Sequence, residues 1–160
     1  MKKIVSYMMT GILLLSFLLT GCGSPEPQTG KKMSMYYINT AETKVEVHEQ
    51  YLNTKTLDEQ LDETMRYLST TPEKLEYKAP LDMGFRVLDY EVEDGKLLIN
   101  VDKAYSELSP TTEVLVRAAI VRTLTQLPNV KYVGITVEDS QLYDSAGCLL
   151  YTSPSPRDTR

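Results

Sequence analysis

The sequence predicts an α+β domain whose strands and helices follow the order β-β-α-β-β-α-β. Three features support this prediction: segments in which apolar and polar residues alternate, two segments with apolar residues at helical spacing, and one strong hairpin turn. Strands and helices mixed over residues 33–142 favour a two-layer sandwich. We therefore expect one mixed sheet with both helices packed on one of its faces.

The first two strands are expected at residues 35–38 and 44–52. The first is a short apolar run that suits a buried strand. In the second, apolar residues alternate with Glu46, His48 and Gln50, and such a period of two is typical of a half-buried strand. We expect His48, the only histidine in the chain, to be exposed on the polar face.

The first helix is expected to begin after Thr56, because Thr56 and Glu59 form a capping-box pattern. Apolar residues then recur at helical spacing as far as Leu68, and Pro72 follows. Residues 73–83 are interpreted as a connecting loop.

Two strands at residues 85–92 and 96–101 are expected to form a hairpin around Asp94 and Gly95, since Asp-Gly is a strong hairpin signal. The second helix is expected after Ser109, a residue suited to the N-cap, with Pro110 at its first position.

This second helix has an unusually wide apolar arc up to Leu127 and Pro128, with Arg117 and Arg122 as its only basic residues. The wide arc predicts burial against a sheet and against something else besides. A final strand is expected at residues 131–137.

The N-terminus has the features of an export signal. Two lysines follow Met1, and an apolar stretch continues to Leu19-Thr20-Gly21-Cys22. This ending resembles the bacterial lipobox, which implies cleavage before Cys22 and a covalent diacylglycerol on its thiol. We therefore expect a signal peptide at residues 1–21 and lipid anchoring on the extracytoplasmic face of the cell membrane.

Composition divides the rest of the chain. Residues 22–32 are rich in Pro, Gly and polar side chains, as expected of a flexible tether. The chain carries a formal charge of −5, and without residues 1–21 and 148–160, which hold four basic residues and one acidic residue, the balance is about −8. An acidic body argues against nucleic-acid binding, which needs a basic surface.

The C-terminal segment does not fit the preceding sequence. Residues 143–147 are interpreted as the start of a linker to a missing second domain. Residues 148–160 are Pro-rich and basic, and they resemble one reading frame of a transposase sequencing adapter. We interpret this segment as non-native, so that Cys148 is not a native thiol.

The sequence contains no arrangement typical of an enzyme or of a metal site. His48 is the only histidine, and no Cys/His cluster is present. The acidic residues of the first helix are those that a helix N-terminus favours. Ser106 and Ser109 lack a Gly-x-Ser-x-Gly elbow, so a capping role is the better interpretation. We expect no catalytic residue, no metal and no cofactor beyond the lipid on Cys22.

A family resemblance covers most of the folded segment. The string Leu97–Asp102 ahead of Tyr105, then Glu113–Arg117 and Thr123–Val130, is similar to the GerMN domain of sporulation and spore germination proteins. The resemblance implies a non-catalytic assembly module of the Gram-positive cell envelope. Proteins of this type often carry two such domains in tandem, of which this chain would hold the first.

The functional hypothesis that follows is a lipoprotein scaffold or adaptor for other envelope proteins or for a copy of itself. Tyrosine and arginine are enriched at protein interfaces, and the residues expected on a contact surface are Tyr90, Tyr105, Arg117, Arg122 and Tyr132. The alternative is a lipoprotein that binds a peptidoglycan fragment or a small solute in a deep pocket lined by Tyr and Asp. A third class, a wall hydrolase, would need positioned carboxylates such as Glu91 and Asp94.

Overall fold

The computed structural model describes residues 30–71, 76–141 and 151–152. Strands and helices follow one another along the chain as β1 (Lys31–Asn39), β2 (Val45–Leu52), α2 (Leu57–Leu68), β3 (Tyr77–Lys78), β4 (Val87–Glu93), β5 (Lys96–Val101), a 3₁₀ helix (Lys103–Glu107), α3 (Pro110–Leu124), β6 (Tyr132–Val137), β7 (Ser140–Gln141) and β8 (Tyr151–Thr152). The α+β class and the order of the main elements are confirmed.

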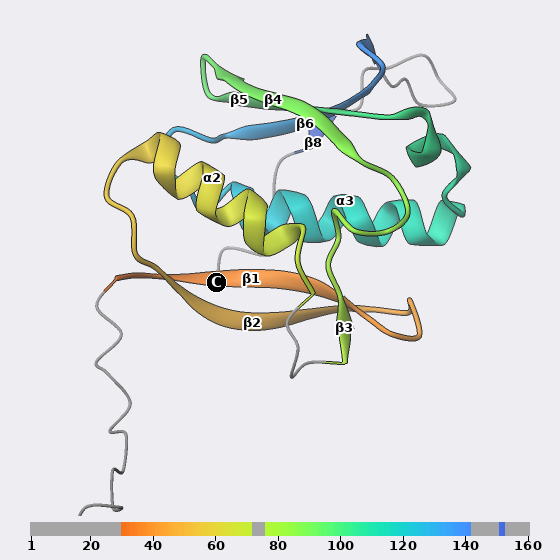
Figure 1. Cartoon of the computed structure of the whole chain (residues 1–160), viewed down its shortest axis with the longest axis horizontal. Helices are drawn as coiled ribbons and strands as arrows, with labels where there is room; N and C mark the ends of the chain where they lie inside the picture. The colour runs from red at the N-terminus through yellow and green to blue at the C-terminus, as the bar shows by residue number, and fades with distance from the viewer. Residues whose placement is uncertain (1–29, 72–75, 142–150, 153–160) are drawn as a thin grey trace, which may run out of the picture.

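The strands form two sheets, and the expectation of a single sheet with both helices on one face is corrected. The first sheet has the order β2-β1-β3, and the second has the order β4-β5-β6-β7 with β8 also paired to β6. Helices α2 and α3 lie between the two sheets (Figure 1). The second sheet is mixed, because β5 is antiparallel to β4 and parallel to β6.

The position of α3 explains its wide apolar arc. Val116, Ile120 and Leu124 are buried in a core cluster that also contains residues of both sheets. A helix covered on two sides needs apolar residues around much of its circumference. The prediction that α3 packs against a sheet and a second element is thus confirmed.

The local signals for helix starts and for the hairpin are also confirmed. The Thr56 side chain accepts from the Glu59 N–H, and the Glu59 carboxylate accepts from the Thr56 N–H, which completes the capping box. Ser109 accepts from the Thr112 N–H at the start of α3. Asp94 and Gly95 have φ values of 49° and 82°, the left-handed conformation that a tight hairpin turn requires.

One side chain of α3 and one just after it cover an edge of β1. The Tyr36 N–H donates to Thr123 Oγ1 at 3.1 Å, and the Ser34 N–H donates to Gln126 Oε1 at 3.0 Å. Gln126 Nε2 also donates to the Ser34 carbonyl at 2.7 Å. These bonds replace a neighbouring strand, because backbone groups at a covered edge need partners.

Three short strands lie where none was expected. β7 follows β6 directly and pairs with its end at Thr136 and Val137. β3 falls within the predicted loop and pairs with the end of β1 at Ile38 and Asn39. β8 falls within residues 148–160, which we interpret as foreign to the gene, and pairs with β6 at Val133 and Gly134.

Candidate functional site

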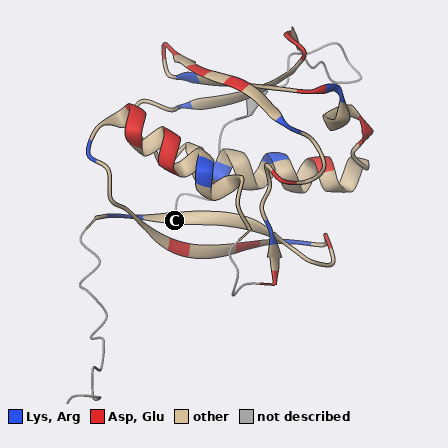
Figure 2. Cartoon of the chain, viewed as in Figure 1, with Lys and Arg blue, Asp and Glu red and all other residues tan. Residues whose placement is uncertain are grey.

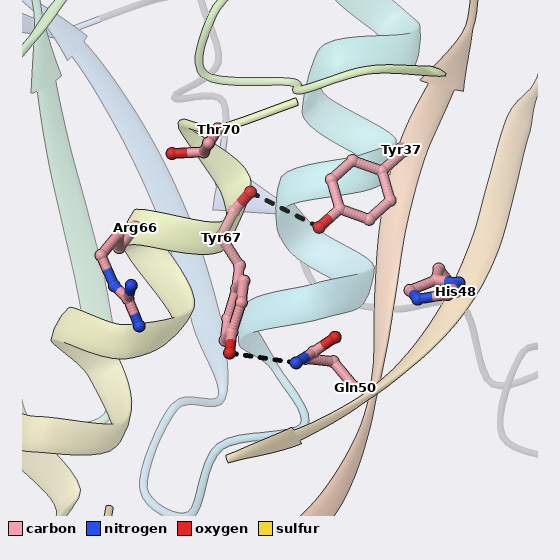
Figure 3. Close-up of a pocket in the computed structure, with 6 residues that line it drawn as sticks. All are labelled: Tyr37, His48, Gln50, Arg66, Tyr67 and Thr70. Carbon is pink, nitrogen blue, oxygen red and sulfur yellow. Dashed lines mark hydrogen bonds between the residues drawn. The ribbon is translucent and has the colours of Figure 1, made fainter. Parts of the chain in front are cut away.

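A pocket lies between strand β2 and the C-terminal part of helix α2. Its volume is about 250 Å³, and it is open to solvent on one side. Figure 3 shows its six lining residues, which come from β1, β2 and α2 and the residues just after α2: Tyr37, His48, Gln50, Arg66, Tyr67 and Thr70.

The register of the first sheet directs the polar face of β2 into this pocket. His48 lies opposite Met35, and Gln50 lies opposite Met33. Paired residues of antiparallel strands share a face, and both methionines are buried. His48 and Gln50 therefore point towards the helices, whereas Val47 on the other face is 57% exposed. The expectation that His48 is exposed is corrected: it is half-buried and lines the pocket.

A chain of hydrogen bonds fixes the two tyrosines of the pocket. Gln50 Nε2 donates to Tyr67 Oη at 3.0 Å, and Tyr67 Oη donates to Glu63 Oε1 at 3.5 Å. Tyr37 Oη donates to the Tyr67 carbonyl at 3.5 Å, as the dashed line in Figure 3 marks. Burial, with a smaller contribution from Tyr67, raises the pKa of Tyr37 to about 12. Tyr37 therefore remains a hydrogen-bond donor at physiological pH.

Glu63 lies behind Tyr67 and is itself only 7% exposed. Its Oε2 accepts from the Asn53 N–H at 3.0 Å and from the Thr54 Oγ1 hydroxyl at 2.8 Å. The carboxylate thus joins α2 to the segment that follows β2. These donors stabilise the negative charge of Glu63 on the side of the carboxylate that faces away from the pocket.

The six residues that line the pocket carry one permanent charge, which is positive. Arg66 lies in the last turn of α2, where a cation is favoured by the helix dipole, and its guanidinium is 5.2 Å from the Tyr67 ring centroid. None of the six lining residues is acidic. Acidic residues lie along β4, in the first turn of α2 and on β2 (Figure 2), where Glu46 and Glu49 pair with Lys44 and Lys32. The pocket offers hydrogen-bond donors, one fixed cation and aromatic rings.

The five residues expected on a contact surface do not form one surface. Tyr105 is buried in the core, with its ring centroid 5.0 Å from that of Phe85, so the expectation of an exposed contact residue is corrected here. Arg117 pairs with Glu113 at 2.8 Å with its side chain 17% exposed.

The other three lie on different elements. Tyr90 on β4 donates to Asp62 Oδ1 of α2 at 2.7 Å, and Arg122 lies 5.0 Å from the ring centroid of Tyr36. Tyr132 at the start of β6 is 46% exposed.

The lipidation residue Cys22 and the preceding Leu19, Thr20 and Gly21 lie outside the described residues. Within the described part of the chain, no helix is long and apolar enough to cross a membrane. The same residues contain no group of three His, Cys, Asp or Glu side chains that could hold a metal ion. Glu91 and Asp94 lie on the exposed β4–β5 hairpin and do not line the pocket.

Comparisons with known proteins agree on one family. The family model Germane, described as sporulation and spore germination, matches residues 34–143. No curated protein shows significant sequence similarity to the chain.

Two solved structures share the fold. The first GerMN domain of the sporulation protein GerM from Bacillus subtilis aligns with a TM-score of 0.58 and 15% identity over 80% of this chain and 99% of that one. The tandem GerMN domains of the same protein align with a TM-score of 0.55 and 18% identity over 84% of this chain. The chain spans about half of that tandem structure, covering 48% of it.

Proposed function

This chain belongs to the Germane family of sporulation and spore germination, and we propose that it acts as a non-catalytic adaptor of the cell envelope. In this proposal, a lipid on Cys22 anchors it to the extracytoplasmic face of the membrane. The folded domain binds another envelope protein or a second copy of itself.

The observation that carries this proposal is the presence of open sheet edges beside exposed apolar side chains. β2 and β4 each lie at an edge of their sheet. Val47 on β2 and Leu88 on β4 are 57% and 50% exposed, and Val114 on α3 is 65% exposed. Unpaired strand edges bind extended segments of other chains through their free backbone groups.

The pocket supports this proposal over the small-ligand alternative. Its volume of about 250 Å³ lies below the range of roughly 300–1,000 Å³ that is typical of small-molecule sites. It contains tyrosines but none of the aspartates that the alternative required. A pocket of this size suits one side chain of a protein partner better than a free solute.

A crosslinking pull-down from membranes tests the proposal. Growing and sporulating cells would be treated with a membrane-impermeant amine crosslinker, and the tagged full-length protein would be recovered from solubilised membranes. We expect a protein partner or a crosslinked dimer. Recovery of the uncrosslinked chain alone under both conditions would count against an adaptor role.

A further inference from the structure

Strand β2 has one hydrogen-bonding edge without a neighbour among the described residues. The N–H groups of Ser34 and Tyr36 bond to side chains of α3 and of Gln126 just after it. The alternating backbone groups of β1, at Met35 for example, therefore face β2. Met35 pairs with His48, so the backbone groups of Val47 and Glu49 point to the opposite side, towards the open edge. This edge can accept one more strand.

The other long edge of this sheet is already occupied. β3 pairs with the end of β1 at Ile38 and Asn39. Earlier in β1, the backbone N–H groups of Tyr36 and Ser34 donate to the side chains of Thr123 and Gln126. β3 itself lies at the opposite edge of the sheet but has only two residues, Tyr77–Lys78, so β2 offers the only long open edge among the described strands of this sheet.

The pocket lies beside this open edge. Side chains of a strand alternate between the two faces of a sheet. An extended segment paired with β2 would consequently direct every second side chain to the face that carries His48 and Gln50. One of those side chains would enter the space between β2 and α2. Backbone pairing then supplies affinity, and the pocket supplies the choice of sequence.

The charges of the pocket identify the side chain that fits. Arg66 is exposed and supplies a permanent positive charge, and Thr70 supplies a hydroxyl donor at the same rim. The nearest buried acid, Glu63, is already bonded to Asn53 and Thr54. Guanidinium and hydroxyl donors bind anions, and the anionic group of an unmodified peptide is a carboxylate.

We infer that the groove between β2 and α2 binds an extended peptide segment of a partner protein, which adds as a strand to β2 and places a carboxylate beside Arg66. The inference rests on the proposed adaptor function and identifies the surface and the chemistry of the partner. The carboxylate belongs to an Asp or Glu side chain or to a chain terminus.

Photocrosslinking in the cells that make the protein tests this inference. p-Benzoylphenylalanine would replace Glu49, whose side chain is exposed next to the open edge, in the full-length chain. Control positions are Leu88 on β4 and Val114 on α3, which are also exposed. Adducts would be identified by the sequence of the crosslinked peptide.

Two pairs of variants test the two parts of the groove. Val47→Pro removes an edge N–H, whereas the matched control Val47→Ala shortens the same side chain and keeps the N–H. Proline is tolerated on an edge strand, and a thermal unfolding curve of each purified variant checks folding. Arg66→Glu reverses the charge of the pocket, whereas Arg66→Lys retains it.

We expect adducts from position 49 with a segment that contains a carboxylate. Their yield should fall about tenfold in Val47→Pro and in Arg66→Glu, which corresponds to the loss of one good polar interaction, and should remain within about twofold in the two controls. Adducts only from positions 88 or 114, or adducts from 49 that neither variant reduces, would overturn the groove and leave the adaptor function standing. No protein adduct from any of the three positions would overturn both.

Discussion

Replacing Thr123 with valine tests whether α3 closes the edge of β1. Thr123 is fully buried, accepts from the Tyr36 N–H at 3.1 Å and donates to the Ala119 carbonyl at 2.9 Å. Valine has nearly the same shape but cannot accept, so the Tyr36 N–H loses its partner. An unsatisfied buried donor costs about 1–3 kcal/mol, and we expect a loss of about 2 kcal/mol in the free energy of unfolding.

Thr125→Val is the matched control on the same helix. Thr125 also donates to the carbonyl four residues earlier, that of Val121, at 2.6 Å. It is only half-buried, and bonds of this kind within a helix add little stability. We expect this control to change the free energy of unfolding by less than about 0.5 kcal/mol.

Urea denaturation of the purified proteins measures both changes. With a slope of about 1.5 kcal/mol per molar urea, a loss of about 2 kcal/mol lowers the midpoint by about 1.3 M. If Thr123→Val and Thr125→Val unfold at the same urea concentration, α3 does not close the β1 edge. The edge of β1 would then be open to strand addition as well as that of β2.

Three further changes test other parts of the structure. Folding raises the pKa of Tyr37 from its ordinary value of 10.0 to about 12. The stability that depends on the protonated Tyr37 hydroxyl is therefore fully present below pH 10 and is lost as the pH rises to 12. Between these pH values, the urea midpoint of Tyr37→Phe should fall less than that of the parent. The buried Tyr105 hydroxyl lies near Arg117 but makes no hydrogen bond of good geometry among the described residues. Tyr105→Phe should therefore unfold within about 0.5 kcal/mol of the parent or be more stable, and a loss above about 1 kcal/mol would show that the contact with Arg117 is a stabilising bond. Asn100 donates to Asp89 at 3.3 Å and to Asp139 at 2.8 Å. Asn100→Asp places a third carboxylate beside these two and should lower the free energy of unfolding by about 2 kcal/mol at pH 7 and by less at pH 4. An equal loss at both pH values would contradict a charge effect.

The sequence predicted those elements whose signals are local. Thr56 with Glu59 and Ser109 with Pro110 marked the starts of α2 and α3, because a capping side chain and its backbone partner are close in sequence. The hairpin at Asp94-Gly95 was predictable for the same reason.

The separation into two sheets depends on contacts between distant residues. β1 and β2 remain apart from the second sheet because Thr123 and Gln126, about 90 residues further along, bond to the free edge of β1. Neither residue has a local signal for this role. The parallel pairing of β5 with β6 likewise requires α3 as the crossover between them.

The candidate site was only partly predictable. Alternation in β2 correctly separated His48 and Gln50 from Val47, but a period of two does not show which face is buried. Here the polar face is directed inward, because the register places it opposite the buried Met33 and Met35. The helical spacing of Arg66 and Thr70 could have suggested a shared rim, although nothing local joined them to β2.

The intact mass of the crosslinked complex recovered from membranes tests the central claim, a lipid-anchored adaptor, most directly. We expect a chain that begins at Cys22, carries diacylglycerol on that residue and is covalently joined to a protein partner. A chain recovered without the lipid, or with the lipid but joined to no protein, would contradict the claim.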